Sequence, residues 1–292
     1  MTYVSEEISS QPQCWSKAAA LARDREASLP VAGERLAVVG CGTSYNMALA
    51  YAALREGTGN GFTDAMPASE LRLRRQYDRY LFLSRSGTTT EVLRALRQVP
   101  RGTPTTAITA APASPIATEA TATVVLDFAS EQSIVQTRFA TSVLVLLRAH
   151  LGEDVGPAIA DARRALDEPL PAGTMTADRF TFLGRDWTVG LAHEAALKLR
   201  EAAQASTESY PAMEFRHGPI SVIDRNSVVW SFGPPPTDLA EQLLPTGATY
   251  IVSDGDALAD LIRAQRVAVE LAKGRGLDPD HPRNLAFSVI LG

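Results

Sequence analysis

A run of hydroxyl side chains follows an apolar stretch in the first third of the chain. The run is Ser84-Arg85-Ser86-Gly87-Thr88-Thr89, and an amphipathic helical pattern begins directly after it. The free N–H groups and positive dipole end of a helix N-terminus favour an anion, and nearby hydroxyls add donors. Because the run lacks the lysine of a Walker loop and the glycines of a dinucleotide loop, we expect a compact monophosphate, such as that on a sugar. The alternative is a capped helix start that binds no ligand.

Three ionisable residues share one face of a later helical segment. Glu194, Lys198 and Glu201 are separated by four and three residues, which puts them on one side of a helix. Carboxylates and an ammonium on one face could supply a base and stabilise developing negative charge. The alternative is a solvated face held by ion pairs. A neighbouring ammonium lowers the pKa of a carboxylate and burial raises it, so the sequence leaves that balance open.

The order of elements indicates how the chain positions these residues. Short apolar runs alternate with helical segments, as in parallel sheets that are covered on both faces. The layout also repeats, because Glu70 follows Gly40 and Glu214 follows Gly184 at the same distance. The predicted strands cover residues 36–40, 80–83, 105–109 and 124–128, and then 180–184, 227–232 and 249–253.

We therefore predict an α/β protein of two tandem, doubly wound parallel-sheet subdomains, each a three-layer α/β/α unit. A phosphate-binding subdomain covers residues 20–151, a linker covers 152–177, and a second subdomain with the catalytic helix and the C-terminal tail covers 178–292. A helix over 5–25 would lie across both halves. Ligands of open α/β sheets bind beyond the carboxyl ends of the strands. Residues 40–44 and 84–89 should consequently face one pocket.

Composition excludes several classes of protein. The 292 residues carry a net charge of −5, which argues against a nucleic-acid partner. No apolar run is long enough to span a membrane, and the polar, acidic start is unlike a signal peptide. Two cysteines and four scattered histidines predict neither a disulfide framework nor a metal site. No motif implies a cofactor. We expect a cytoplasmic enzyme or small-molecule binder.

Five motifs resemble those of the sugar isomerase (SIS) domain family, which includes the isomerase half of glucosamine–fructose-6-phosphate aminotransferase and amino-sugar phosphate deaminases. The resemblance covers nearly the whole chain. Because Met1 stands almost directly before the isomerase part, we expect no glutaminase domain. In chain order the motifs are Cys41-Gly42-Thr43-Ser44-Tyr45-Asn46, the hydroxyl run, Glu194-Ala195-Ala196-Leu197-Lys198-Leu199-Arg200-Glu201, Glu214-Phe215-Arg216-His217-Gly218-Pro219 and Pro282-Arg283-Asn284-Leu285-Ala286.

The resemblance implies a site for a phosphorylated sugar. Arg85 stands where the aminotransferase has glutamine, so a charge-assisted contact with the phosphate is expected. Gln136 replaces a serine of the family. The implied phosphate ligands are Ser84, Arg85, Ser86 and Thr89, and the implied sugar contacts are Thr43, Ser44, Ile134 and Gln136.

The resemblance also implies catalytic roles. Glu201 matches the carboxylate that shuttles the proton, Lys198 matches an active-site lysine, and His217 matches the histidine that opens the sugar ring. Imidazole titrates near neutral pH, which suits that step. In the family this histidine reaches the neighbouring subunit's site, so the resemblance implies a homodimer. Phe287 stands where the aminotransferase has its Schiff-base lysine, and this argues against glutamine-dependent synthesis.

Three functions fit these expectations. The first is an aldose–ketose isomerase or deaminase that acts on a phosphorylated (amino) hexose, such as glucosamine-6-phosphate, by transfer of a proton between C1 and C2. The second is a sugar-phosphate sensor without catalysis, which the replacement at Phe287 favours and the lack of a basic helix-turn-helix stretch before Ser5 opposes. The third is a deglycase of sugar–amino acid phosphates. We predict the first.

Overall fold

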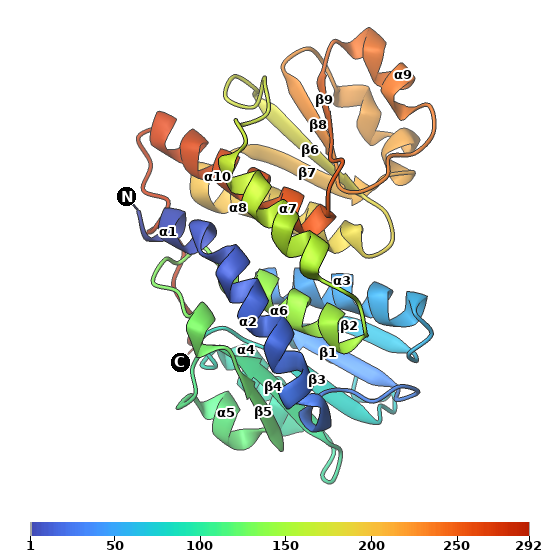
Figure 1. Ribbon diagram of the computed structural model, residues 1–292, viewed down its shortest axis with the longest axis vertical. Coiled ribbons are helices and arrows are strands. Elements are labelled where there is room, and N and C mark those ends of the chain that lie inside the picture. Colours follow the sequence, from blue (N-terminus) through green and yellow to red (C-terminus); the bar gives the residue numbers. More distant parts are fainter. Residues whose placement is uncertain (1, 292) are drawn as a thin grey trace.

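The chain forms two parallel β-sheets, one from each half (Figure 1). The computed structural model describes residues 2–291. The first sheet has the order β2-β1-β3-β4-β5 and the second has the order β7-β6-β8-β9, which confirms the predicted tandem α/β fold. The strands are β1 (Leu36–Gly40), β2 (Thr63–Pro67), β3 (Arg79–Leu83), β4 (Thr105–Thr109) and β5 (Ala122–Val125), then β6 (Arg179–Gly184), β7 (Ser206–Pro211), β8 (Ser227–Ser231) and β9 (Thr249–Val252).

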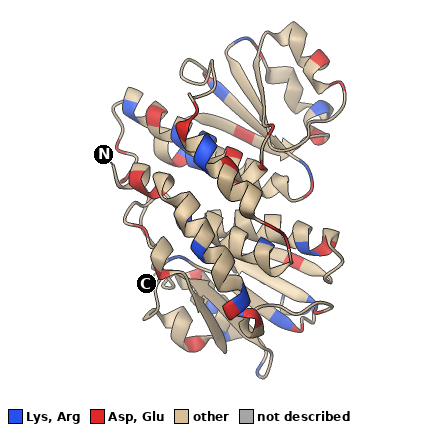
Figure 2. Ribbon diagram, viewed as in Figure 1, with Lys and Arg blue, Asp and Glu red and all other residues tan. Residues whose placement is uncertain are grey.

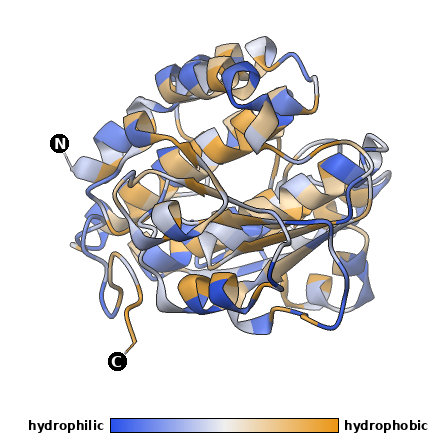
Figure 3. Cartoon of the chain, turned by 90° about the horizontal axis from the view of Figure 1, so that it is seen from below, coloured by the Kyte–Doolittle hydropathy of each residue, from blue (hydrophilic) through white to orange (hydrophobic). Residues whose placement is uncertain are grey.

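Helices fill the space between the sheets and cover their outer faces (Figure 1). One large apolar core joins the inner faces of both sheets through the central helices, and two smaller cores lie on the outer faces. In Figure 3 the strands are mostly orange and the helices mix orange with blue, as amphipathic helices on a buried sheet do. The helices are α1 (Tyr3–Ser9), α2 (Gln11–Asp24), α3 (Thr43–Gly57), α4 (Thr90–Gln98), α5 (Pro115–Glu119), α6 (Arg138–His150), α7 (Gly156–Asp167), α8 (Thr188–Ala203), α9 (Leu239–Leu243) and α10 (Ala257–Gly274).

The two halves meet where α3 crosses α8. Gly190 lies so close to α3 that a Cβ atom at this position would come within 2.5 Å of the Asn46 carbonyl oxygen. When Gly40 is aligned with Gly184, Gly190 is the counterpart of Asn46 in the second half. Equivalent positions that touch one another mark a pseudo-twofold axis, as in a symmetric dimer interface. The duplicated halves therefore pack face to face around this crossing.

Two of the observed strands were not predicted from the sequence. Both β2 and β7 lie at a sheet edge next to the first strand of their half. Their sequences, TDAMP and STESYP, are polar and end in proline, because an edge strand needs neither two buried faces nor every ladder hydrogen bond. The strand predicted at 124–128 is also displaced, since β5 begins at Ala122 and residues Asp127–Ala129 form a 3₁₀ turn.

The predicted N-terminal helix is two helices. Pro12 stands in the first turn of α2, where its missing N–H is harmless, and it prevents α1 from continuing. Helix α2 packs on α6 of the first half and α1 packs on α10 of the second, so this stretch does lie across both halves, as predicted. Among the helices of residues 2–291, none combines the length and apolar character that a bilayer crossing requires.

Candidate functional site

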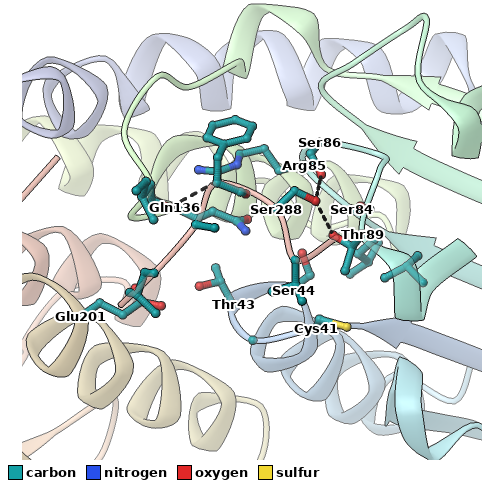
Figure 4. A pocket seen from close by; sticks show the side chains of 18 residues that line it. Cys41, Thr43, Ser44, Ser84, Arg85, Ser86, Thr89, Gln136, Glu201 and Ser288 are labelled. Atoms are coloured by element: carbon teal, nitrogen blue, oxygen red, sulfur yellow. Dashed lines mark hydrogen bonds between the residues drawn. The ribbon is translucent and has the colours of Figure 1, made fainter. Parts of the chain in front are cut away.

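A pocket of about 190 Å³ opens where β1 and β3 end, between the first half, the end of α8 and the C-terminal tail (Figure 4). Both predicted turns, 40–44 and 84–89, contribute to its wall, which confirms that they face one pocket. Cys41, from the first turn, also lines it. The predicted site residues in the wall are Thr43, Ser44, Ser84, Arg85, Ser86, Thr89, Ile134, Gln136 and Glu201.

Four hydroxyl side chains at the end of β3 form a concave group, here called the hydroxyl cup: Ser84, Ser86, Thr88 and Thr89. Ser84 Oγ accepts the Gly87 N–H at 3.2 Å and Ser86 Oγ accepts the Thr88 N–H at 3.3 Å. Gly87 has φ +65°, and any Cβ there would clash with Ser114. Helix α4 starts directly after the cup, so its dipole favours an anion at this point.

Arg85 is buried and points away from the cup, toward the segment before α6. Its terminal nitrogens donate to the Ser133 carbonyl at 2.9 Å, to the Ile134 carbonyl at 3.2 Å and to the Phe287 carbonyl at 3.0 Å, and they pair with Glu131 at 3.3 Å. Within the described residues only Nε is left without a partner. The terminal nitrogens of Arg85 are therefore occupied by contacts within the protein. The charge-assisted phosphate contact expected of Arg85 stays a prediction for its Nε only.

The ionisable residues of α8 form a buried cluster, so the interpretation as a solvated surface face is wrong. Lys198 is 1% exposed; its ammonium lies 2.5 Å from Glu201 and 3.3 Å from Glu194 and donates to the Thr43 hydroxyl at 2.9 Å. Asn46 donates to Glu194 at 2.9 Å. The cluster thus joins the second half's helix to the turn after β1.

Burial and neighbouring charge, whose balance the sequence left open, act differently on Glu194 and Lys198. Burial dominates at Glu194. It raises the pKa of Glu194 even though Lys198 opposes the shift. Burial alone would lower the pKa of Lys198, but Glu194 and Glu201 outweigh it and raise that pKa. Lys198 therefore stays a cation between two carboxylates. Of the three, Glu201 alone lines the pocket, and Figure 4 shows it across from the hydroxyl cup with Thr43 and Ser44 between them.

Two predicted catalytic residues lie outside the pocket wall. Lys198 sits directly behind Glu201, whereas His217 is exposed in a 3₁₀ turn (Glu214–His217) of the second half. The geometry of a single chain therefore leaves the role of His217 as a prediction. Groups of three or more His, Cys, Asp or Glu that could hold a metal are absent from residues 2–291.

Two buried acidic residues, Glu131 and Glu7, hold the segment that carries Ile134 and Gln136. Glu131 accepts the Thr137 N–H at 2.6 Å, and Glu7 accepts the Gln132 N–H at the same distance. Burial, followed by the charge of Glu131, raises the pKa of Glu7. Glu7 comes from α1, so the N-terminal helix helps to shape the pocket.

The comparisons with known proteins fit this architecture. Residues 31–150 match the SIS domain family model. The chain carries a SIS domain. Its matched region covers the whole first sheet, the hydroxyl cup and the segment before α6.

Similar proteins extend the likeness over the second half. Glutamine–fructose-6-phosphate aminotransferase (isomerizing) from Methanothermobacter thermautotrophicus is 29% identical over 88% of the chain and 52% of its own length. Glucosamine-6-phosphate deaminase from Thermotoga maritima is 25% identical, with a TM-score of 0.83 over 99% of this chain and all of the other. Tagatose-6-phosphate ketose/aldose isomerase from Escherichia coli has a TM-score of 0.82 at 18% identity over 97% and 98% of the two chains. The chain spans about half the length of the curated aminotransferases that it matches.

By resemblance the sequence placed Phe287 at the active site, but it did not predict that the tail reaches the hydroxyl cup. Residues 285–289 form one wall of the pocket, and Ser288 reaches the hydroxyl cup. Nothing in the periodicity of a short, irregular tail signals this contact. Glu7 and Glu131 were missed for a similar reason, because their partners are remote in sequence or outside any regular element.

Proposed function

We propose that this protein is a phosphosugar isomerase or deaminase that converts a phosphorylated hexose by proton transfer between C1 and C2. The observation that carries the proposal is the pairing of two unlike groups in one pocket: the hydroxyl cup at one side and the Glu201 carboxylate at the other. A cup without its own cation suits a phosphate that binds through hydroxyl and N–H donors. A carboxylate at the far end suits a base that acts on the sugar carbons.

The chemistry follows from this arrangement. With the phosphate in the cup, the open-chain sugar extends past Thr43 and Ser44 toward Glu201. Glu201 takes the C2 proton and returns it to C1, and Lys198 orients Glu201 through their contact at 2.5 Å. The side-chain amide oxygen of Gln136 (Oε1) has no partner among the described residues, so it is available to a hydroxyl or amine of the sugar.

The amino-sugar version needs no covalent enzyme intermediate. Phe287 cannot form an imine. Proton transfer in glucosamine-6-phosphate would produce the fructose imine, and water would hydrolyse this imine to fructose-6-phosphate and ammonia. The similarity to glucosamine-6-phosphate deaminase from Thermotoga maritima favours this substrate.

We further propose a homodimer in which His217 reaches the partner's pocket and opens the sugar ring. The motif around His217 and its exposure in the single chain support this. We also propose residues 20–151 and 178–292 as the two subdomains joined by a linker at 152–177, since each of the two ranges contains one sheet.

The test is NMR of the protein with glucosamine-6-phosphate in deuterated water. Deuterium at C2 of the recovered sugar together with fructose-6-phosphate and ammonia would establish a deaminase. Exchange and interconversion of neutral hexose phosphates without ammonia would establish an isomerase. Binding without exchange across such a panel would overturn the proposal and support a sensor.

A further inference from the structure

The hydroxyl cup is already filled by a side chain of the same protein. Ser288 Oγ lies 3.1 Å from Ser86 Oγ, 3.0 Å from Thr88 Oγ1 and 3.3 Å from Thr89 Oγ1. Figure 4 shows Ser288 between the cup and the centre of the pocket. Three hydroxyls that are well placed to hold an anion therefore converge on one oxygen, and this oxygen belongs to the tail.

The contact makes the tail a competitor of any phosphate in the cup. Each hydroxyl has a single proton to donate, so a cup hydroxyl that donates to Ser288 has no proton left for a ligand. A phosphate oxygen that uses the same donors must occupy the position of Ser288 Oγ. The two oxygens exclude one another by contact distance.

Four further contacts keep the tail in place. The guanidinium carbon of Arg85 lies over the Phe287 ring, 3.8 Å from the ring centroid. Arg85 also donates to the Phe287 carbonyl at 3.0 Å. The Thr90 N–H donates to the Val289 carbonyl at 3.0 Å, and the Leu291 N–H donates to the Thr90 hydroxyl at 2.9 Å. Phe287 is nevertheless 41% exposed and Ile290 is 72% exposed, so release uncovers little additional apolar surface.

We propose that tail residues 285–291 form a strap that closes the anion site of the empty protein. Ser288 stands in for a phosphate oxygen, and the strap is released when a sugar phosphate takes its place. This inference rests on the anion site of the proposed function and adds a selection step to it. A neutral sugar cannot displace the strap, whereas a phosphate dianion gains stronger hydrogen bonds than the Ser288 hydroxyl does. The apparent affinity is lowered by the fraction of molecules that are closed.

The first test is calorimetric titration with inorganic phosphate and with glucosamine-6-phosphate. Ser288→Ala is expected to bind both about fivefold more tightly than wild type, which corresponds to the loss of one net competing hydrogen bond. Phe287→Ala, which weakens the latch to Arg85, should give about a twofold gain. Ile290→Ala is the matched control on the same tail, because its exposed side chain lines no part of the pocket, and it should bind as wild type does.

The second test is amide hydrogen exchange of the tail and of Thr90 with and without phosphate. Faster exchange with phosphate supports the strap, because the hydrogen bonds of Thr90 and Leu291 are lost. Slower exchange, or weaker binding by Ser288→Ala, would overturn it, since Ser288 would then be a ligand that closes over the phosphate. If neither wild type nor any variant binds phosphate, the anion site itself fails, and the proposed function fails with it.

Discussion

The two halves share one plan but differ at the ends of their strands and along their first helices. In both, a glycine ends the first strand so that the following helix can approach closely, Gly40 against Ser44 and Gly184 against Thr188. In both, a polar edge strand pairs with that first strand. With the glycines aligned, Val38 is equivalent to Phe182. Their partners on the neighbouring strands, Leu81 and Trp230, are therefore equivalent too. The cup residues Ser84, Ser86 and Thr89 then correspond to Gly233, Pro235 and Asp238.

The helices differ in the opposite sense. Glu194, Lys198 and Glu201 of α8 correspond to Ala50, Leu54 and Gly57 of α3. The first half has the turn proposed to bind an anion, and its helix α3 has Ala, Leu and Gly at the positions of the ionisable residues of α8, whereas the second half has an ionisable helix and a proline-rich turn. Repetition of the fold therefore provides two equivalent places for chemistry, and the side chains give each half a different task. Five experiments, in order of decreasing expected effect, test this difference between the halves.

The largest effect is expected from Glu201→Gln. Because a positioned general base contributes about 10²- to 10⁴-fold, deuterium exchange at C2 should fall at least about 10³-fold, while calorimetry should show phosphate affinity within about twofold of wild type. Glu241→Gln, in the exposed α9 of the same half, is the control. Unchanged exchange in Glu201→Gln would contradict the assignment of proton transfer to α8.

The double variant Ser86→Ala, Thr89→Val tests the task of the first half. Loss of two hydrogen bonds to a charged ligand, about 1.5 kcal/mol each, should raise the KM for a sugar phosphate about 100-fold and change kcat much less. Thr237→Val in the corresponding turn of the second half is the control, and steady-state kinetics make the comparison. Equal losses in the two turns would mean that the halves have not specialised.

Gly190→Ala tests the joint between the halves. The added methyl group would press on the Asn46 carbonyl and on Ala50 of α3, and such overpacking costs about 2 kcal/mol in free energy of unfolding. Gly274→Ala at the end of α10, where a Cβ meets nothing within 4 Å, is the control in urea denaturation. A variant as stable as wild type would show that the crossing is looser than the structure indicates.

Asp260 should make the stability of the second half depend on pH. Burial raises its pKa to about 6, against the hydrogen bond from Trp230 and the charge of Arg263. Because the folded state binds this proton more tightly than the unfolded state, stability should fall as pH rises, by about 1 kcal/mol between pH 5 and 7. Leu81, the counterpart of Trp230, has no such partner. Asp260→Asn should flatten this part of the profile in urea titrations at both pH values; an unchanged slope would exclude Asp260 as its source.

The smallest effect is expected from mixing two variants. Glu201→Gln and His217→Ala should each be inactive on cyclic sugar, yet random mixed dimers would recover about a quarter of wild-type activity, since one of the two sites in each mixed dimer is intact. Activity after joint refolding is the measurement. No recovery, with mixed dimers shown to form, would place His217 in its own chain's site or outside catalysis.

Local patterns were sufficient for much of this protein. The apolar runs predicted seven of the nine strands, and the spacing of Glu194, Lys198 and Glu201 predicted their common face, because both depend on neighbours close in sequence. The position of the hydroxyl run at a strand end was predicted from the apolar stretch before it and the helical pattern after it. In Figure 2, Lys and Arg are interspersed with Asp and Glu along the ribbon of both halves.

The amino-acid pattern was enough to predict the repeated α/β plan, the turn suited to an anion and the ionisable helix. Three-dimensional packing was needed to show that Arg85 holds the wall of the pocket together, that Lys198 is buried between two carboxylates, and that Ser288 fills the cup. These outcomes depend on contacts between residues up to about 200 positions apart, and on burial that no local pattern encodes. The physical reason is that hydrogen bonding and desolvation act through space, whereas periodicity reports only the path of the chain.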